Sequence, residues 1–151
     1  MGDEEKLARL LWDRLRLDSL PVDVAGIARN YCDVEWDDVP FVDAVLVGKT
    51  RRERPLIVLA NCKPRRRERF TLAHELGHAL IPWHLGVMTC HTDWRNPDPE
   101  EVEANRFASE LLLPRAYVEQ QSLERSLPRR SRDVHGISVR SSASPQQLPG
   151  C

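Results

Sequence analysis

The sequence has few cysteines and no long apolar run. Its four cysteines are scattered along 151 residues without a C-x-x-C pair, so neither a thiolate zinc knuckle nor a dense disulfide framework is indicated. No apolar segment approaches the roughly 20 residues that a membrane-spanning helix needs. The acidic N-terminal residues are not followed by the apolar core of a secretory signal peptide. These absences predict a cytoplasmic protein with reduced thiols and no membrane partner.

An excess of charge of either sign is also lacking. The formal net charge is −1 at pH 7 and the pI is about 6.5, so the chain as a whole does not attract nucleic acid. Arginine clusters only locally, within residues 51–54 and 63–69. A solvated loop or helix face explains such clusters more often than a phosphate-binding patch does. We therefore expect no direct binding to nucleic acid.

The length and composition predict one domain with tails. A chain of 151 residues, 41% hydrophobic and 30% charged, is sufficient for a single two-layer core. Apolar residues at helical spacing predict an amphipathic helix over 3–17, and a second short helix is expected over 22–30. The stripe of the first helix comprises Leu7, Leu10, Leu11 and Leu15. Apolar runs at 34–36, 41–47 and 55–60 predict a small, mostly antiparallel sheet, with a hairpin between the last two strands.

Prolines mark the limits of two further helices. Pro64 suits the first turn of a helix that should end near Ile81, because Pro82 disfavours helical geometry in the residue before it. The second helix should start at Asp98 and end before Pro114. A loop is predicted between them. Beyond Gln120 the chain is polar and rich in serine, arginine and proline, which predicts an irregular or disordered tail over 121–151.

The stretch His74-Glu75-Leu76-Gly77-His78 lies inside the first of these helices. Residues four apart share a helix face, so the two imidazoles can reach one metal ion. Glu75 sits about 100° around the helix, where it can take a proton from an attacking water. This spacing inside a predicted helix favours a zinc site over an ordinary helix with two histidines. Gly77 costs about 1 kcal/mol relative to alanine in a helix, which indicates that another element packs against it.

A catalytic zinc ion takes three protein ligands, and the helix after Asp98 is the natural source of the third. Its apolar stripe follows helical spacing and consists of Ala104, Phe107, Ala108, Leu111 and Leu112. Glu101 falls inside this stripe and Glu103 outside it. Because an unpaired carboxylate facing the core is costly, we favour Glu101 as the ligand. The alternative for Glu101 is a capping-box bond to its own helix start, and Glu103 is the reserve ligand or a partner of the ligands.

Several other polar residues have no assigned role. His84, Cys90 and His91 in the connecting loop could line a cleft, and either histidine could donate a hydrogen bond to a developing oxyanion. Tyr117 is a comparable candidate. Such residues are more often structural or solvent-exposed, so none is assigned to the site.

Two segments together closely resemble the ImmA/IrrE family of zinc metallopeptidases, namely RFTLAHELGH at 69–78 and EVEANRFASELLLP at 101–114. The resemblance extends over about residues 22–118. It implies an α+β fold, a compact thermolysin-like (zincin) single domain whose small sheet packs on the helix carrying HExxH. It further implies that Zn²⁺ is bound by His74, His78 and a glutamate of the second segment, best matched by Glu101, and that Glu75 is the general base.

The same resemblance implies a zinc endopeptidase that hydrolyses a protein regulator. The expected substrate is a helix-turn-helix (XRE-type) repressor of a mobile element or a stress response. Residues 1–20 would then form an N-terminal helix, 21–120 the metallopeptidase domain, and 121–151 the tail. Family members usually continue with helical segments where this chain turns polar. A second hypothesis therefore stays open, a non-catalytic zinc-stabilised module that binds and controls a transcription regulator.

Overall fold

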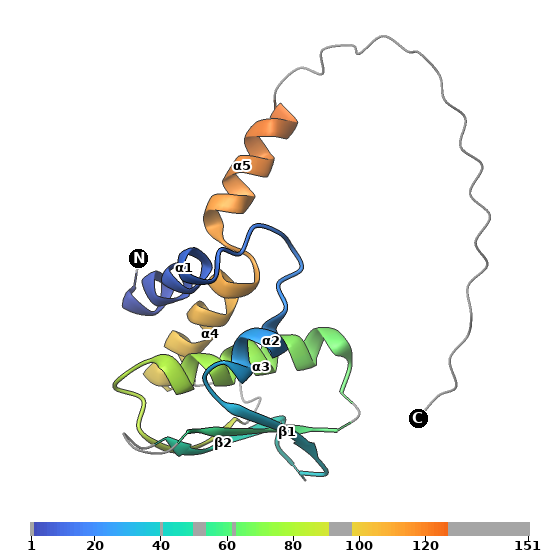
Figure 1. Ribbon diagram of the computed structural model, residues 1–151, viewed down its shortest axis with the longest axis vertical. Helices are drawn as coiled ribbons and strands as arrows, with labels where there is room; N and C mark the ends of the chain where they lie inside the picture. The colour runs from blue at the N-terminus through green and yellow to red at the C-terminus, as the bar shows by residue number, and fades with distance from the viewer. Residues whose placement is uncertain (1, 40, 50–53, 62, 91–97, 127–151) are drawn as a thin grey trace, which may run out of the picture.

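The computed structural model describes residues 2–39, 41–49, 54–61, 63–90 and 98–126. It is a mixed α+β fold in which α2 and α3 lie along one side of a four-stranded sheet (Figure 1). Among the described residues, none of the helices combines the length and the apolar character that crossing a membrane requires. The elements are α1 (Asp3–Leu15), α2 (Val24–Arg29), β1 (Asp33–Asp37), β2 (Ala44–Lys49), β3 (Leu56–Ala60), α3 (Arg65–Leu80), β4 (Gly86–Cys90), α4 (Pro99–Leu112) and α5 (Arg115–Ser126).

The sheet has the strand order β1-β3-β2-β4. As predicted, β2 and β3 pair antiparallel, whereas β1 joins β3 in parallel. The edge strand β4 pairs antiparallel with β2 and lies where the sequence predicted a loop. The five residues of β4 do not alternate between apolar and polar side chains, so their sequence did not indicate a strand. Their strand conformation comes from pairing with β2. The sheet thus receives its last strand from the segment that follows α3.

The core lies on two sides of α3, between α3 and the sheet and between α3 and α4. Helix α3 runs without a break through the HELGH sequence, and Ile81 leaves helical geometry with ψ 118° before Pro82, as the proline rule predicts. On α4 the predicted stripe is confirmed, since four of its residues are fully buried and Leu112 is partly buried. The largest buried core side chains from these layers are Leu46, Ile57, Leu59, Leu76, Phe107 and Leu111.

Helix α1 packs against α4. The Trp12 indole Nε1–H donates to the backbone oxygen of Leu111 at 2.9 Å, and the Arg9 guanidinium pairs with Glu110 at 2.7 Å. One residue of the predicted apolar face is misplaced, because Leu10 is 61% exposed while Leu11 is buried. The buried face is centred on Ala8 and Leu11, because that side of α1 is the one turned toward α4.

Helix α5 corrects the predicted start of the tail. Residues 121–126, expected to be irregular, form its last turns. Gln120 and Gln121 both donate to the Glu124 carboxylate, at 3.2 and 3.3 Å. Glutamine, glutamate, arginine and leucine all favour helix. A polar composition is shared by exposed helices and disordered tails, so it could not distinguish between them here. Figure 1 shows α5 extending away from the other helices, and residues 127–151 of the expected tail lie outside the described residues.

Gly77 is where α3 comes close to α4, as its helix cost indicated. A Cβ at this position would lie 2.9 Å from Cδ1 of Phe107 and 3.4 Å from Cα of Ala104. Phe107 is fully buried, so its ring has little room to move. The clash should lower the free energy of unfolding of Gly77→Ala by about 1–3 kcal/mol. Alanine gains about 1 kcal/mol in helix propensity, which offsets part of this loss, so we expect a net destabilisation. Urea unfolding measures the change.

A double-mutant cycle separates this contact from other effects of the substitution. In a Phe107→Leu background, the smaller side chain makes room for the added methyl group, so Gly77→Ala should cost less there than in the wild-type chain. Strict additivity of the two substitutions would show that the contact with Phe107 is not why position 77 is glycine.

Candidate metal centre

Two helices bring three potential ligands to one point. His74 and His78 lie one turn apart on α3, and Glu101 stands in the first turn of α4. The two imidazole Nε2 atoms are 3.1 Å apart. The Glu101 carboxylate oxygens lie 3.1 Å from His74 Nε2 and 3.3 Å from His78 Nε2. In the part of the chain that the structure describes, these residues form the group able to hold a metal ion, with ligand atoms all within 4.8 Å of one another.

The separations match those around a small divalent ion. Ligands about 2.0–2.2 Å from a tetrahedral zinc ion are roughly 3.3 Å from each other, close to the 3.1–3.3 Å measured here. Two imidazoles and one carboxylate are also a donor set that zinc accepts, with a position left over for water or substrate. The side chains present therefore fit a metal ion in both chemistry and spacing.

The electrostatics of the group favour a cation. Burial lowers the pKa of His78 and outweighs its hydrogen bond to Glu101, which keeps the ring neutral as a ligand must be. Burial also lowers the pKa of His74. The hydrogen bond to Glu101 and the charge of Glu75 outweigh this effect, and the pKa of His74 lies above its ordinary value. The hydrogen bonds from His74 and His78 lower the pKa of Glu101 strongly. A metal ion would take the place of the proton that the carboxylates stabilise on His74.

Asn105 orients one of the histidines. Its Oδ1 lies 3.0 Å from His74 Nδ1, and an amide oxygen can only accept, so the Nδ1–H of His74 donates. In the neutral ring that a metal ion requires, the lone pair of His74 is then on Nε2, the nitrogen that faces Glu101. No role was predicted for Asn105 from the sequence. The available signal was its position four residues after Glu101, which places both side chains on the same face of α4.

The remaining candidates separate into distinct positions. Glu75 is fully buried on α3, close enough to His74 for its charge to raise the pKa of that ring. Glu103 contacts a different histidine, in the turn after α3. Its Oε2 accepts from Trp83 Nε1 at 2.6 Å and from His84 Nε2 at 3.0 Å. These bonds, the one from Trp83 first, lower the pKa of the Glu103 carboxyl.

The alternative of a capping role for Glu101 can be compared with the contacts at the helix start. Asp98 caps α4, accepting from the backbone N–H of Glu100 at 3.4 Å, while the Glu101 carboxylate faces the two histidines. Tyr117 lies on α5 and is 38% exposed. His91 and the side chain of Cys90 lie outside the described residues.

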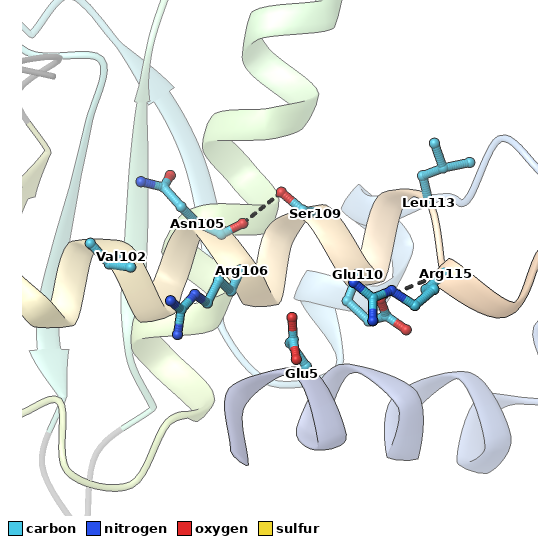
Figure 2. Close-up of a pocket in the computed structure, with 8 residues that line it drawn as sticks. All are labelled: Glu5, Val102, Asn105, Arg106, Ser109, Glu110, Leu113 and Arg115. Atoms are coloured by element: carbon cyan, nitrogen blue, oxygen red, sulfur yellow. Dashed lines mark hydrogen bonds between the residues drawn. The ribbon is translucent and has the colours of Figure 1, made fainter. Parts of the chain in front are cut away.

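A pocket of about 290 Å³ lies on another side of α4, between it and α1 (Figure 2). In Figure 2, Glu5 and Arg106 face each other across the gap between these helices, while the Asn105 side chain points away from it. The acidic groups beside it are paired, Glu110 with Arg9 and Glu4 with Arg106. None of the three potential metal ligands lines this pocket. The candidate site is therefore the one where α3 meets α4. The pocket is lined by Glu5, Val102, Asn105, Arg106, Ser109, Glu110, Leu113 and Arg115.

The chain matches the model of a known protein family. The family model Peptidase_M78, described as the IrrE N-terminal-like domain, matches residues 23–146. The matched range contains α3 and α4, and with them the three potential ligands, Glu75 and Asn105. A search of curated proteins found no match for the chain.

Proposed function

This chain belongs to the family of IrrE N-terminal-like peptidase domains, and on that premise we propose that it is a zinc-dependent endopeptidase with a thermolysin-like active site. His74, His78 and Glu101 are the proposed ligands, and Glu75 is the proposed general base. The observation that carries the proposal is the convergence of two imidazole nitrogens and a carboxylate within 4.8 Å at the crossing of α3 and α4.

Each residue of the proposed site has a separate role in peptide hydrolysis. A bound zinc ion supplies a Lewis acid that polarises the substrate carbonyl and makes water more acidic. The Glu75 carboxylate takes one proton from water as the water oxygen bonds to the carbonyl carbon. It then passes that proton to the amine nitrogen as the C–N bond breaks. Asn105 holds His74 in the tautomer that a ligand needs.

The proposed substrate is a helix-turn-helix (XRE-type) repressor of a mobile element or a stress response, met in the cytoplasm. The resemblance of the two sequence segments to the ImmA/IrrE family supports this choice. Strand β4 offers a feature suited to a peptide, because it lies at the edge of the sheet and pairs among the described strands with β2 alone. An extended substrate segment can add to such an edge through backbone hydrogen bonds. No direct contact with DNA is part of the proposal.

Co-incubation with repressors encoded beside its gene tests the proposal. The zinc-loaded protein should cut one of them at discrete bonds, which mass spectrometry of the fragments locates. Chelation should stop the reaction, and added zinc should restore it. If the metal-loaded protein releases a repressor from its operator while the repressor stays intact, the non-catalytic module is the better description.

A further inference from the structure

A third histidine contacts His78 on the side of its ring opposite Nε2. His84 follows α3 in the turn before β4 and is fully buried. Its Nδ1 lies 2.9 Å from Nδ1 of His78, and its Nε2 lies 3.0 Å from Oε2 of Glu103. Glu103 stands two residues after Glu101 on α4. A line of hydrogen bonds thus runs from α4 through His84 to the side of His78 that faces away from Glu101.

The positions of the protons along this line follow from the partners. A neutral imidazole has one N–H and one lone pair. If His78 presents the lone pair of Nε2 to a metal ion, its proton is on Nδ1 and is donated to His84 Nδ1. His84 then accepts at Nδ1, so its own proton is on Nε2. That N–H points to the Glu103 carboxylate, which accepts. Each contact has one donor and one acceptor, and the sequence of bonds is consistent from end to end.

We propose that His84, held by Glu103, is a positioning residue that fixes His78 in its Nδ1–H tautomer and directs Nε2 toward the metal ion. The inference rests on the metal centre of the proposed function. His84 plays for His78 the part that Asn105 plays for His74, so each histidine ligand has its own acceptor. Both acceptor systems depend on α4, which supplies Glu101, Glu103 and Asn105 at alternate positions. Partners of this kind raise metal affinity by fixing the ligand before the ion arrives.

Two substitutions of His84 separate its two hydrogen bonds. His84→Asn places an amide oxygen near the position of Nδ1, so it can still accept from His78, but it does not reach Glu103. His84→Gln places its amide near the position of Nε2, so it can still bond Glu103, but it leaves His78 Nδ1–H without its acceptor. His84→Phe removes both bonds at similar size. Trp83→Phe is the control, because it removes a bond to Glu103 and leaves the line from Glu103 to His78 intact.

The measurement is zinc affinity by competition with a chromophoric chelator, together with the melting temperature of each metal-free protein. We expect His84→Asn and Trp83→Phe to stay within about 3-fold of wild type. His84→Gln and His84→Phe should bind zinc about 10–100-fold more weakly. In the zinc-loaded protein, NMR should show a slowly exchanging Nδ1–H of His78 in the wild type and in His84→Asn, and faster exchange with water in His84→Gln, where this N–H loses its acceptor.

Several outcomes would overturn the inference. Equal affinity in all variants would show that His84 does not act on the metal ligand, and a stronger effect of His84→Asn than of His84→Gln would reduce it to a tether to Glu103. If the His84 variants fail to fold, Glu103 provides the same test from a side chain that is 30% exposed, with Glu103→Leu expected to weaken zinc binding more than Glu103→Gln. If the wild-type chain binds no zinc, the metal centre itself is refuted. If the wild-type chain binds zinc and the His84 and Glu103 variants bind it equally tightly, only the role of His84 is refuted.

Discussion

Replacement of Glu75 by glutamine is expected to lower kcat/KM for substrate cleavage by about 100- to 10,000-fold, the usual contribution of a general acid–base group. Glutamine has nearly the size of glutamate and fits the same fully buried position on α3, but its amide cannot accept a proton from water. The zinc content should stay unchanged, because Glu75 is not among the three proposed ligands. Fragment formation followed by mass spectrometry gives the rate, and elemental analysis gives the metal content.

Glu68→Gln is a matched control, since it makes the same chemical change in the first turn of α3, away from the ligands. It should leave both rate and metal content near wild type. Hydrolysis by Glu75→Gln within a few-fold of wild type would contradict the assigned role. If Glu75→Gln still controls the repressor while loss of the metal abolishes control, the protein acts as a non-catalytic module.

Removal of a histidine ligand is expected to have the second large effect. His74→Ala leaves one imidazole and one carboxylate, and zinc affinity should fall by more than about 100-fold, since loss of even an outer partner costs 10–100-fold. Zinc at about 100 times its Kd should stabilise the wild-type fold by about 2.7 kcal/mol, because the ion binds only the folded chain. Thermal unfolding with and without zinc should therefore show a shift for wild type and none for His74→Ala.

Leu72→Ala separates metal binding from general stability. Leu72 is a buried core residue half a turn before His74 on the same helix, and its truncation should cost about 2–5 kcal/mol. The melting temperature of Leu72→Ala should be low but should still rise on addition of zinc. A zinc-dependent rise in His74→Ala equal to that of wild type would show that His74 is not a ligand.

The convergence of the three proposed ligands could be predicted because it depends largely on local rules. Four-residue spacing puts His74 and His78 on one helix face whatever the rest of the fold does, and Pro82 ends that helix by a clash with the residue before it. Glu101 could be placed because helical periodicity alone puts it on the apolar side of α4. The close packing at Gly77 could be inferred from its propensity cost, although not the identity of Phe107 as its neighbour.

The partners of the ligands could not be predicted, because they meet through tertiary structure. His84 reaches His78 only because the chain turns back after Ile81 toward β4, and Glu103 meets His84 only because α4 crosses α3. Strand β4 likewise depends on β2, which is about 40 residues earlier in the chain. In the sequence, His84 and His91 were equivalent candidates for an oxyanion donor, and only the fold shows that His84 contacts His78.

The most direct test of the metal centre is elemental analysis of the protein purified without added metal and after removal of any affinity tag. About one zinc ion per chain, lost on substitution of His74, His78 or Glu101 and retained in Glu75→Gln, is the predicted result. A wild-type protein that contains no metal and cannot be loaded with zinc would contradict it, and would leave HELGH as a helix with two histidines and no metal.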